Sequence, residues 1–371
     1  MEVKVGFITT IDTNIGDNFI RRGIENIVKN IHNTSSPHFT YVNKHLPETA
    51  IVNKSPIHLL KKSKPFPGRG KLMNFYDKYL YHYFSVYNSQ DIIIQSGAPV
   101  LWPDCQNNEW AIPIWYKTIG KLHKKIPVLN IAAGSCYPWE HRNGFFNDDE
   151  KKYAADIGSF CKLTTTRDIL ANRLFTEAGV KNVLMPCSAF FVDQHVENKN
   201  HGEYILINYM PGGGHFDWGQ NINGNSWEEA IKNLIKSLGS KYEIHFICHN
   251  EKEVAAAQRI APGNRIHLPD SVESYLEVIR KAIIGINNRM HASVAMASVG
   301  VPSLSIGTDT RLLMLENLGL PIFYVKDVSG QLLNEEVIKL IAQKDTERKR
   351  LFELKSSGFN KYSRLLETYF R

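Results

Sequence analysis

Short runs of apolar and β-branched residues alternate along this chain with stretches whose apolar residues recur at helical spacing. The first apolar run covers residues 3–9, and the stretch after it places Ile20, Ile24, Ile27 and Ile31 three or four residues apart. Such spacing puts these four side chains on one face of a helix. The alternation therefore predicts repeated strand–helix–strand units, in which helices cover a parallel sheet.

The apolar runs fall into two series, separated by a polar and aperiodic stretch at residues 193–202. At 371 residues, the chain also exceeds the usual size of one domain. We therefore predict an α/β protein with two Rossmann-like, doubly wound domains, at residues 1–195 and 203–345, and a C-terminal helical segment at residues 346–371. The later strands are expected at residues 91–97, 126–134, 162–166, 182–186, 203–210, 242–248, 281–287 and 301–307.

Two such domains face each other across a cleft, and ligands of open α/β sheets bind beyond the carboxyl ends of the strands. Residues that directly follow a strand are therefore the first candidates for function. Two helices also carry end signals. Asp168 is expected to cap one helix that stops at Gly179, and Ser226 with Glu229 has the spacing of a capping box.

The composition is that of a globular protein with a moderate positive charge. The chain is 43% hydrophobic, and its net charge of +7 favours anionic partners such as phosphorylated small molecules, acidic glycans or a membrane face. No nucleic-acid-binding motif accompanies this charge, so no nucleic-acid partner is expected. The basic residues at 61–71 and in the C-terminal stretch would suit peripheral contact with the inner face of a membrane, although a solvated surface is the simpler explanation.

The cysteines and the N-terminus indicate the compartment. The five cysteines are widely spaced and form no CxxC pair, which argues against a zinc site and for a reducing compartment. The chain enters a strand-like pattern at once, without the layout of a signal peptide, and no apolar run approaches the ~18 residues that span a bilayer. We expect a cytoplasmic protein without a metal site.

A cation and an imidazole stand at the start of a predicted helix, because Arg289 follows the strand at 281–287 and His291 lies within the next turn. The helix dipole disfavours a cation there by ~0.3–1 kcal/mol unless an anion offsets it. With the free N–H groups of the helix start, Arg289 would bind a phosphate or carboxylate. His291 would then change protonation with the anion, as a general acid or base does. In the alternative reading, Arg289 pairs with an acidic side chain and His291 packs against the neighbouring strand.

Arg167 repeats this arrangement in the first domain, between the strand at 162–166 and the helix that Asp168 begins. The functional hypothesis is that Arg167 and Arg289 converge on one anion across the cleft, with Asp168 orienting Arg167. A surface pair between Arg167 and Asp168 is the structural alternative.

Asn14, Gly16 and Asp17 join the first strand to the first helix and border the same cleft. Gly16 permits close approach of a ligand, while Asp17 either caps the helix or contacts the ligand. The stretch matches no nucleotide-binding loop, so it implies no nucleotide.

Loops of the second domain supply further candidates. Asp309 would orient His291 or Arg289, and Arg311 would add charge. The structural alternative is that Asp309 caps a helix beside a solvated Arg311. The glycine-rich loop at residues 211–214 would form a wall of the cleft, with His215 and Trp218 as sugar contacts or as ordinary core or surface residues. By topology alone, His249 points toward the cleft.

Three of these stretches resemble a known family. "NNRMHASVAMASVGVPSLSIGTD" (residues 287–309) is similar to the C-terminal signature of the polysaccharide pyruvyltransferases, in which an Arg-x-His tripeptide opens an Ala-rich helix. "TNIGDN" resembles that family's N-terminal Asn-x-Gly-Asp, and "TTRDILANRLFTEAGV" resembles its Arg-Asp helix. The matches lie in the expected order and span nearly the whole chain.

The resemblance implies a GT-B-like fold and the transfer of a pyruvyl group from phosphoenolpyruvate to a saccharide or lipid-linked saccharide as a ketal. It places His291 at the catalytic position, and Arg289 and Arg167 at positions that bind phosphoenolpyruvate. We add Met290, Asn14, Gly16, Asp17 and Asp309 as substrate-binding residues. Phosphoenolpyruvate is the donor substrate, and no metal or organic cofactor is required.

Two positions depart from the family pattern, and two other functions compete. The family's double glycine after an early strand is Ser96-Gly97-Ala98 here, and its Pro-Asp near the end of the first domain is Pro186-Cys187. A glycosyltransferase that uses a nucleotide sugar would have the same fold, since an Arg and a His at a helix start could grip a diphosphate. A catalytically inactive glycan- or anion-binding protein is the non-enzymatic alternative.

Overall fold

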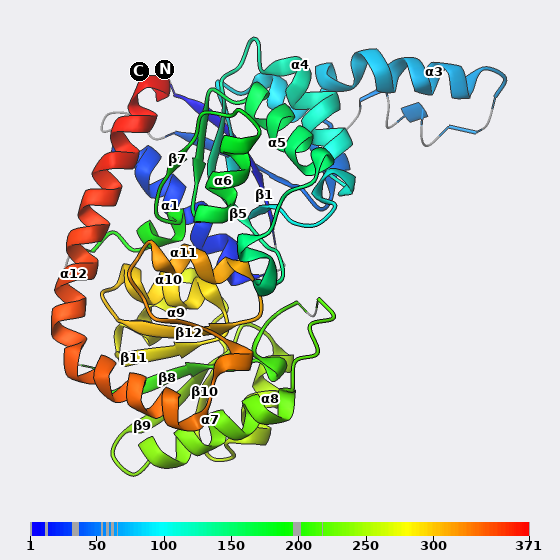
Figure 1. Cartoon of the computed structure of the whole chain (residues 1–371). Coiled ribbons are helices and arrows are strands. Elements are labelled where there is room, and N and C mark those ends of the chain that lie inside the picture. Colours follow the sequence, from blue (N-terminus) through cyan, green and yellow to red (C-terminus); the bar gives the residue numbers. More distant parts are fainter. Residues whose placement is uncertain are drawn as a thin grey trace.

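The computed structural model describes residues 2–11, 14–31, 37–52, 55–56, 59–60, 63–64, 66–195, 202–216 and 218–370. Figure 1 shows two α/β domains, one above the other, each built on a parallel sheet. The predicted α/β architecture with two such domains is therefore confirmed. Of the polar stretch expected as a linker, residues 196–201 lie outside the described part of the chain.

The first sheet has the strand order β2-β1-β3-β5-β6-β7, with β4 paired to β5. Strands β3 and β5 are buried along their whole length, as is usual for parallel strands in the middle of a sheet. Strand β2 was not predicted, because its residues are mostly half-exposed and mix polar with apolar side chains. The strands are β1 (Lys4–Thr9), β2 (His38–Asn43), β3 (Ile92–Ser96), β4 (Pro99–Leu101), β5 (Val128–Ser135), β6 (Leu163–Thr166) and β7 (Val183–Leu184), and the helices are α1 (Ile15–Ile31), α3 (Arg69–Phe75), α4 (Gly120–Leu122), α5 (Asp148–Phe160) and α6 (Ile169–Glu177).

The second sheet has the order β10-β9-β8-β11-β12-β13, also with parallel pairings. Its order reverses between β8 and β11, which is the point where ligands of doubly wound sheets bind. The short strands β10 and β13 at its two edges were not predicted. The strands are β8 (Tyr204–Asn208), β9 (Glu243–Ile247), β10 (Arg265–His267), β11 (Ala282–Asn287), β12 (Ser303–Gly307) and β13 (Ile322–Tyr324), and the helices are α7 (Gly224–Leu238), α8 (Glu251–Ile260), α9 (Val272–Arg280), α10 (Met290–Ser298) and α11 (Leu313–Glu316).

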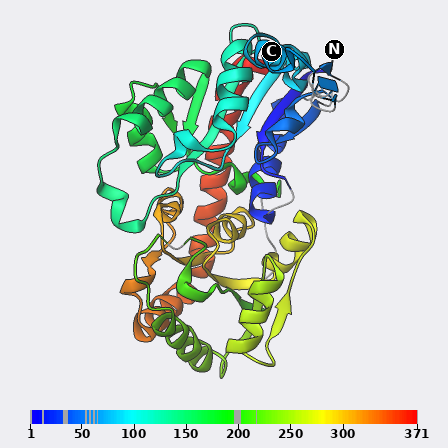
Figure 2. The same cartoon turned by 90° about the vertical axis from the view of Figure 1, so that its right-hand side faces the viewer.

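A long helix, α12 (Gly330–Phe370), runs along both domains and is coloured from orange to red in Figures 1 and 2. It packs against α7 of the second domain and then against α1 of the first. The C-terminal helical segment expected from residue 346 is thus continuous with a helix that begins at Gly330. On the opposite side in Figure 1, α3 projects from the first domain, and the basic stretch at residues 61–71 is helical from Arg69.

The helix ends agree with the sequence in one case and differ in another. Asp168 caps α6 by accepting a hydrogen bond from the N–H of Ala171 (2.8 Å), and Gly179 follows the helix with a φ of +74°. The capping box of Ser226 is wrong, because Ser226 lies inside α7 and donates its own N–H to the side chain of Asn223, the N-cap.

The two domains meet in a hydrogen-bonded seam. The N–H of Tyr137 donates to Oγ1 of Thr310, and the N–H of Thr310 donates to the carbonyl of Tyr137. Each of these hydrogen bonds is 2.9 Å long. The N–H of Trp139 donates to the carbonyl of Thr308 over 3.1 Å. This seam joins the loop after β5 to the loop after β12 and so fixes one end of the space between the sheets.

Candidate functional site

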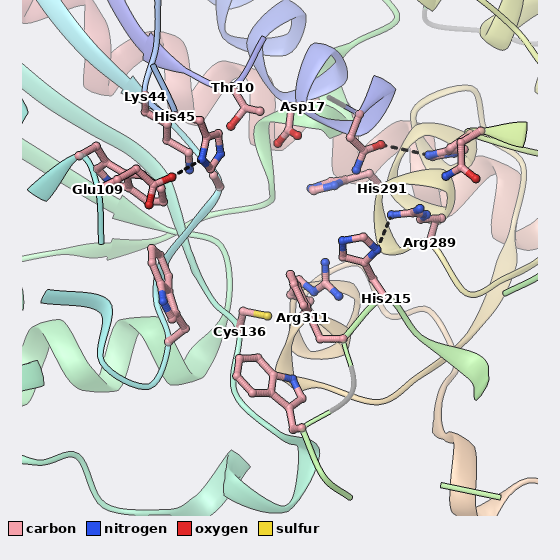
Figure 3. Close-up of a pocket in the computed structure, with 18 residues that line it drawn as sticks. Thr10, Asp17, Lys44, His45, Glu109, Cys136, His215, Arg289, His291 and Arg311 are labelled. Carbon is pink, nitrogen blue, oxygen red and sulfur yellow. Dashed lines mark hydrogen bonds and ion pairs between the residues drawn. The ribbon is translucent and has the colours of Figure 1, made fainter. Parts of the chain in front are cut away.

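A cavity of about 810 Å³ lies between the domains, where the loops that follow β1, β2, β9, β11 and β12 converge. Figure 3 shows His45 and Glu109 on one side, His215 and Arg289 on the other, and Asp17 between them. The cavity is lined by Thr10, Asn14, Asp17, Lys44, His45, Ala98, Trp102, Glu109, Trp110, Cys136, His215, Phe216, Trp218, His249, Asn250, Arg289, His291 and Arg311.

Arg289 occupies the N-cap position of α10, with an extended backbone and no capping hydrogen bond from its side chain. Its guanidinium donates from Nε (2.9 Å) and Nη2 (2.6 Å) to Oε1 of Glu253, which is 3% exposed. The acidic partner that the sequence left open as an alternative is therefore present. Nη1 of Arg289 lies 3.3 Å from Nδ1 of His215, so the arginine still faces the cavity while it is paired.

Arg167 and His291 meet across the domain boundary. Nη1 of Arg167 donates to Nε2 of His291 over 3.1 Å, so the imidazole is neutral and carries its proton on Nδ1. Burial, followed by the charge of Arg167, holds the pKa of His291 well below its ordinary value. The sequence predicted that both residues border one site. It did not predict that the arginine contacts the imidazole directly.

Arg167 is fully buried and lacks a carboxylate partner among the described residues. Its other near neighbour is Sγ of Cys187, 3.8 Å from Nη1, and its Nη2 has no hydrogen-bond partner in the described part of the chain. Gly134 makes room for it, because a Cβ at that position would lie 2.2 Å from Nε of Arg167. The site thus contains a buried cation that no carboxylate of the described residues neutralises directly.

The two aspartates expected to orient the site residues have other partners. Asp168 accepts hydrogen bonds from the N–H and hydroxyl of Ser135 (2.8 and 2.9 Å), so it holds the carboxyl end of β5 instead of the guanidinium of Arg167. Asp309 accepts from Nε (2.8 Å) and Nη2 (2.6 Å) of Arg311 and orients that arginine instead of His291 or Arg289. Arg311 lines the cavity, as expected.

The start of α1 reaches the cavity through Asn14 and Asp17, while Gly16 contacts His291. Oδ1 of Asn14 accepts from the N–H of Gly16 (3.1 Å) and lies 3.2 Å from Nδ1 of His249, so the capping role considered for Asp17 falls to Asn14. Gly16 packs against the imidazole of His291, since a Cβ there would lie 3.0 Å from Nδ1 of that ring. Burial raises the pKa of Asp17, which lines the cavity one residue further on.

Four predicted site residues, Arg167, Gly16, Asp309 and Met290, are not among the residues that line this cavity. Met290 is the first residue of α10. Its side chain is 7% exposed and packs beside Gly307, and it borders a separate recess of about 20 Å³ together with Arg289 and His291.

His215, Trp218 and His249 do line the larger cavity. Burial, with the nearby guanidinium groups of Arg289 and Arg311, lowers the pKa of His215 to about 4, and burial lowers that of His249 to about 4.

One wall of the cavity, formed by first-domain residues other than Asn14 and Asp17, was missed from the sequence. It consists of Lys44 and His45, which follow the unpredicted strand β2, and of Trp102, Glu109 and Trp110 in the loop after β4. Recognition of β2 would have supplied the signal, because its carboxyl end points to the same edge as β1.

No group of three His, Cys, Asp or Glu side chains among the described residues is arranged to hold a metal ion. Within the same residues, no helix is long and apolar enough to cross a membrane.

Comparisons with known proteins agree with this architecture. The model of the family described as polysaccharide pyruvyl transferase matches residues 14–310. No curated protein sequence matches the chain. Among solved structures, the UDP-GlcNAc 2-epimerase from Neisseria meningitidis bound to UDP-GlcNAc is 11% identical with a TM-score of 0.54, over 99% of this chain and 100% of that one. A putative UDP-N-acetylglucosamine 2-epimerase from Listeria monocytogenes is 12% identical with a TM-score of 0.53, over 95% and 91%. Identities this low concern the fold alone, which is the predicted GT-B fold.

Proposed function

The chain belongs to the polysaccharide pyruvyl transferase family, and we propose on that premise that it transfers the pyruvyl group of phosphoenolpyruvate to a saccharide as a ketal and releases phosphate. Such a reaction serves the synthesis of cell-surface polysaccharides or exopolysaccharides. The observation that carries the proposal is the contact between Arg167 and the neutral His291 at the cavity, 3.1 Å apart. It combines an uncompensated cation with a group that can exchange a proton.

The donor fits the charge of this end of the cavity. Phosphoenolpyruvate carries a phosphate and a carboxylate, and a buried guanidinium without a carboxylate partner gains most from such an anion. In our proposal Arg167 and Arg289 attract the two anionic groups from the two domains. Arg289 keeps Glu253 as its fixed partner, so that its orientation precedes donor binding.

The proposed chemistry moves two hydroxyl protons and breaks one C–O bond. One acceptor hydroxyl attacks C2 of phosphoenolpyruvate while C3 gains a proton and becomes a methyl group, with His291 as general acid or base. The C2–O bond to phosphate then breaks, and the second hydroxyl closes the ketal at C2. Its proton leaves with the phosphate as hydrogen phosphate. The guanidinium groups stabilise the departing anion.

Release of phosphate from phosphoenolpyruvate in the presence of saccharide acceptors tests the proposal. Replacing His291 with Ala is expected to lower the rate by about 10²- to 10⁴-fold, the usual contribution of a general acid or base. His38→Ala is the matched control, because His38 is exposed at the amino end of β2, away from the cavity. Full activity of the His291→Ala variant would contradict the assigned role.

Thermal stabilisation by different ligands separates the competing functions. Phosphoenolpyruvate is expected to stabilise the protein more than UDP- or GDP-sugars do, whereas a nucleotide-sugar glycosyltransferase would show the reverse. An inactive binding protein would be stabilised without turnover over a broad acceptor panel.

Peripheral membrane contact and a lipid-linked acceptor are proposals that follow from the basic stretches alone, and sedimentation with anionic vesicles tests them.

A further inference from the structure

The cavity is much larger than the donor requires. Its volume of about 810 Å³ is in the upper part of the range for sites that enclose drug-sized ligands, whereas phosphoenolpyruvate has only ten non-hydrogen atoms. The residues assigned to the donor lie on the wall of the second domain and around His291. The opposite wall, formed by Lys44, His45, Trp102, Glu109 and Trp110, has no role in the donor chemistry described above.

This wall presents one indole to the cavity and holds it with another. The rings of Trp102 and Trp110 lie 5.4 Å apart between centroids, tilted by 55°. Trp110 is 6% exposed, because the edge of His45 packs on it at 4.9 Å and Nζ of Lys44 lies 4.5 Å from its ring centre. Trp102 is half-buried and is the more accessible indole at the cavity. An aromatic face of this kind packs against the C–H face of a sugar ring.

Lys44 gives the wall an unusual donor. The residue is 4% exposed and lines the cavity, yet its ammonium forms no hydrogen bond or ion pair with a described residue. Burial lowers its pKa to about 8. Burying an ammonium group without an acceptor costs free energy. Hydrogen bonds from its N–H groups to oxygen atoms of a ligand would offset this cost.

Beside it, Nδ1 of His45 and Oε1 of Glu109 form a hydrogen-bonded pair of 2.7 Å. The His45 side chain is 39% exposed and that of Glu109 is 54% exposed, so both polar ends reach the solvent of the cavity. A carboxylate accepts hydrogen bonds from hydroxyl groups, whereas an ammonium donates to them. The wall therefore offers both kinds of partner that a diol needs.

We infer that this wall binds the acceptor as a pyranoside, with the sugar ring stacked on Trp102 and its hydroxyl groups bonded to Lys44 and Glu109. The inference rests on the proposed function for the direction of transfer, since it places the acceptor hydroxyls opposite the donor held near His291. Lys44 and Trp102 are then the residues that determine acceptor affinity, and they act without contributing to donor binding.

Ligand-observed NMR tests the inference without turnover, with methyl pyranosides of glucose, galactose, mannose and N-acetylglucosamine as probes in saturating phosphoenolpyruvate. We expect at least one probe to receive saturation from the unmodified protein. Trp102→Ala and Lys44→Met are each expected to weaken its binding about tenfold or more, which corresponds to ~1.4 kcal/mol. Stabilisation by phosphoenolpyruvate should be unchanged in both variants.

Three further variants complete the design. Trp102→Phe keeps an aromatic face and is expected to retain most of the affinity. Phe145→Ala removes an aromatic ring that is 92% exposed outside the cavity, and Lys124→Met removes an exposed ammonium; neither should change pyranoside binding. Undiminished binding by folded Trp102→Ala and Lys44→Met, or no pyranoside binding by the unmodified protein, overturns the inference. Pyranoside binding that depends on Trp102 in a protein that phosphoenolpyruvate does not stabilise would support this site and refute the proposed donor.

Discussion

Arg167 donates a hydrogen bond to His291 over 3.1 Å, although 124 positions separate the two residues and each belongs to a different domain. The bond occupies Nε2 of the imidazole and leaves only Nδ1 to exchange a proton. It also depends on the domains being in register, since the arginine follows β6 and the histidine follows β11. Any change in the angle between the domains would therefore alter the protonation of the proposed catalytic group.

Replacing Arg167 with Met should weaken the binding of phosphoenolpyruvate by about ten- to a hundredfold, because a hydrogen bond to a charged group contributes ~1.5–3 kcal/mol. Calorimetric titration of the donor measures the loss, and the NMR titration of His291 should show its pKa moving up toward the ordinary value. Arg167→Lys keeps the charge without the planar fork and is expected to recover little. Arg173→Met, on the helix that follows, is the control; an equal loss there would contradict the assignment.

Cys187 offers a way to neutralise the same cation. Its Sγ lies 3.8 Å from Nη1 of Arg167, where the family pattern has an aspartate. In Cys187→Asp the new carboxylate competes with the donor for the guanidinium, so we expect the Kd for phosphoenolpyruvate to rise about tenfold or more. Cys187→Ser is the neutral control. Unchanged donor affinity in the aspartate variant would mean that Arg167 does not contribute charge to the donor site.

Gly16 tests how closely the first helix must approach the imidazole. A Cβ at this position would lie 3.0 Å from both Cβ and Nδ1 of His291. In Gly16→Ala the ring is displaced from Arg167, and we expect the rate of phosphate release to fall at least tenfold. Alanine favours a helix by ~1 kcal/mol over glycine, and this gain opposes the cost of displacing the ring. The free energy of unfolding should therefore change little. Loss of stability in proportion to activity would instead indicate a general packing defect, and urea denaturation distinguishes the two.

Glu253 holds the second arginine. It is 3% exposed and accepts from Nε and Nη2 of Arg289, from Nδ2 of Asn208 (3.0 Å) and from the N–H of His249 (2.9 Å). Glu253→Gln leaves a buried guanidinium without its charge partner, which should lower the free energy of unfolding by ~3–5 kcal/mol. Glu251→Gln, exposed on the same helix, is the control.

A double-mutant cycle identifies the source of that loss. Combining Glu253→Gln with Arg289→Met should cost less than the sum of the two single changes, because the second removes the charge that the first leaves unpaired. Additive losses would show that the ion pair is not what Glu253 contributes.

The sequence located the residues that follow clear strands. Arg289 and Arg167 were recognised because buried apolar runs end immediately before them, and the topology of parallel sheets brings such ends to one edge. Lys44 and His45 were missed because β2 is mostly half-exposed and has no clear apolar pattern. Trp102 was missed because it lies in a loop, where periodicity gives no information.

Contacts between residues far apart in the chain could not be predicted from the sequence, for a different reason. Arg289 and Glu253 are 36 positions apart and follow β11 and β9, which are separated in the sheet by β8. Their contact depends on that strand order and on side-chain packing. Neither is encoded in local spacing. Asp309 is a different case, because its partner Arg311 is only two positions away and spacing alone allows several neighbours as its partner.

Three of the four histidines that line the cavity, His215, His249 and His291, predict how stability depends on pH. The pKa values of His215 and His249 lie near 4 and that of His291 is also lowered, whereas an unfolded histidine titrates near 6.5. The unfolded chain therefore binds more protons, so stability is full above about pH 6.5 and declines as the pH falls toward 4. Urea denaturation between pH 7.5 and 5 should show this decline, and His38→Ala, a histidine outside the cavity, should leave its size unchanged.

Donor binding should reverse part of this effect. A phosphate and a carboxylate in the cavity favour the imidazolium forms, so the pKa values of these histidines rise and phosphoenolpyruvate binds together with protons. Calorimetric titration at pH 6, in buffers of different ionisation enthalpy, measures the number of protons taken up. We expect net uptake in the unmodified protein and a smaller value in His291→Ala, while His38→Ala should match the unmodified protein. Binding without proton uptake at pH 6 would mean that the anion lies away from His291, and the proposed donor site would have to be abandoned.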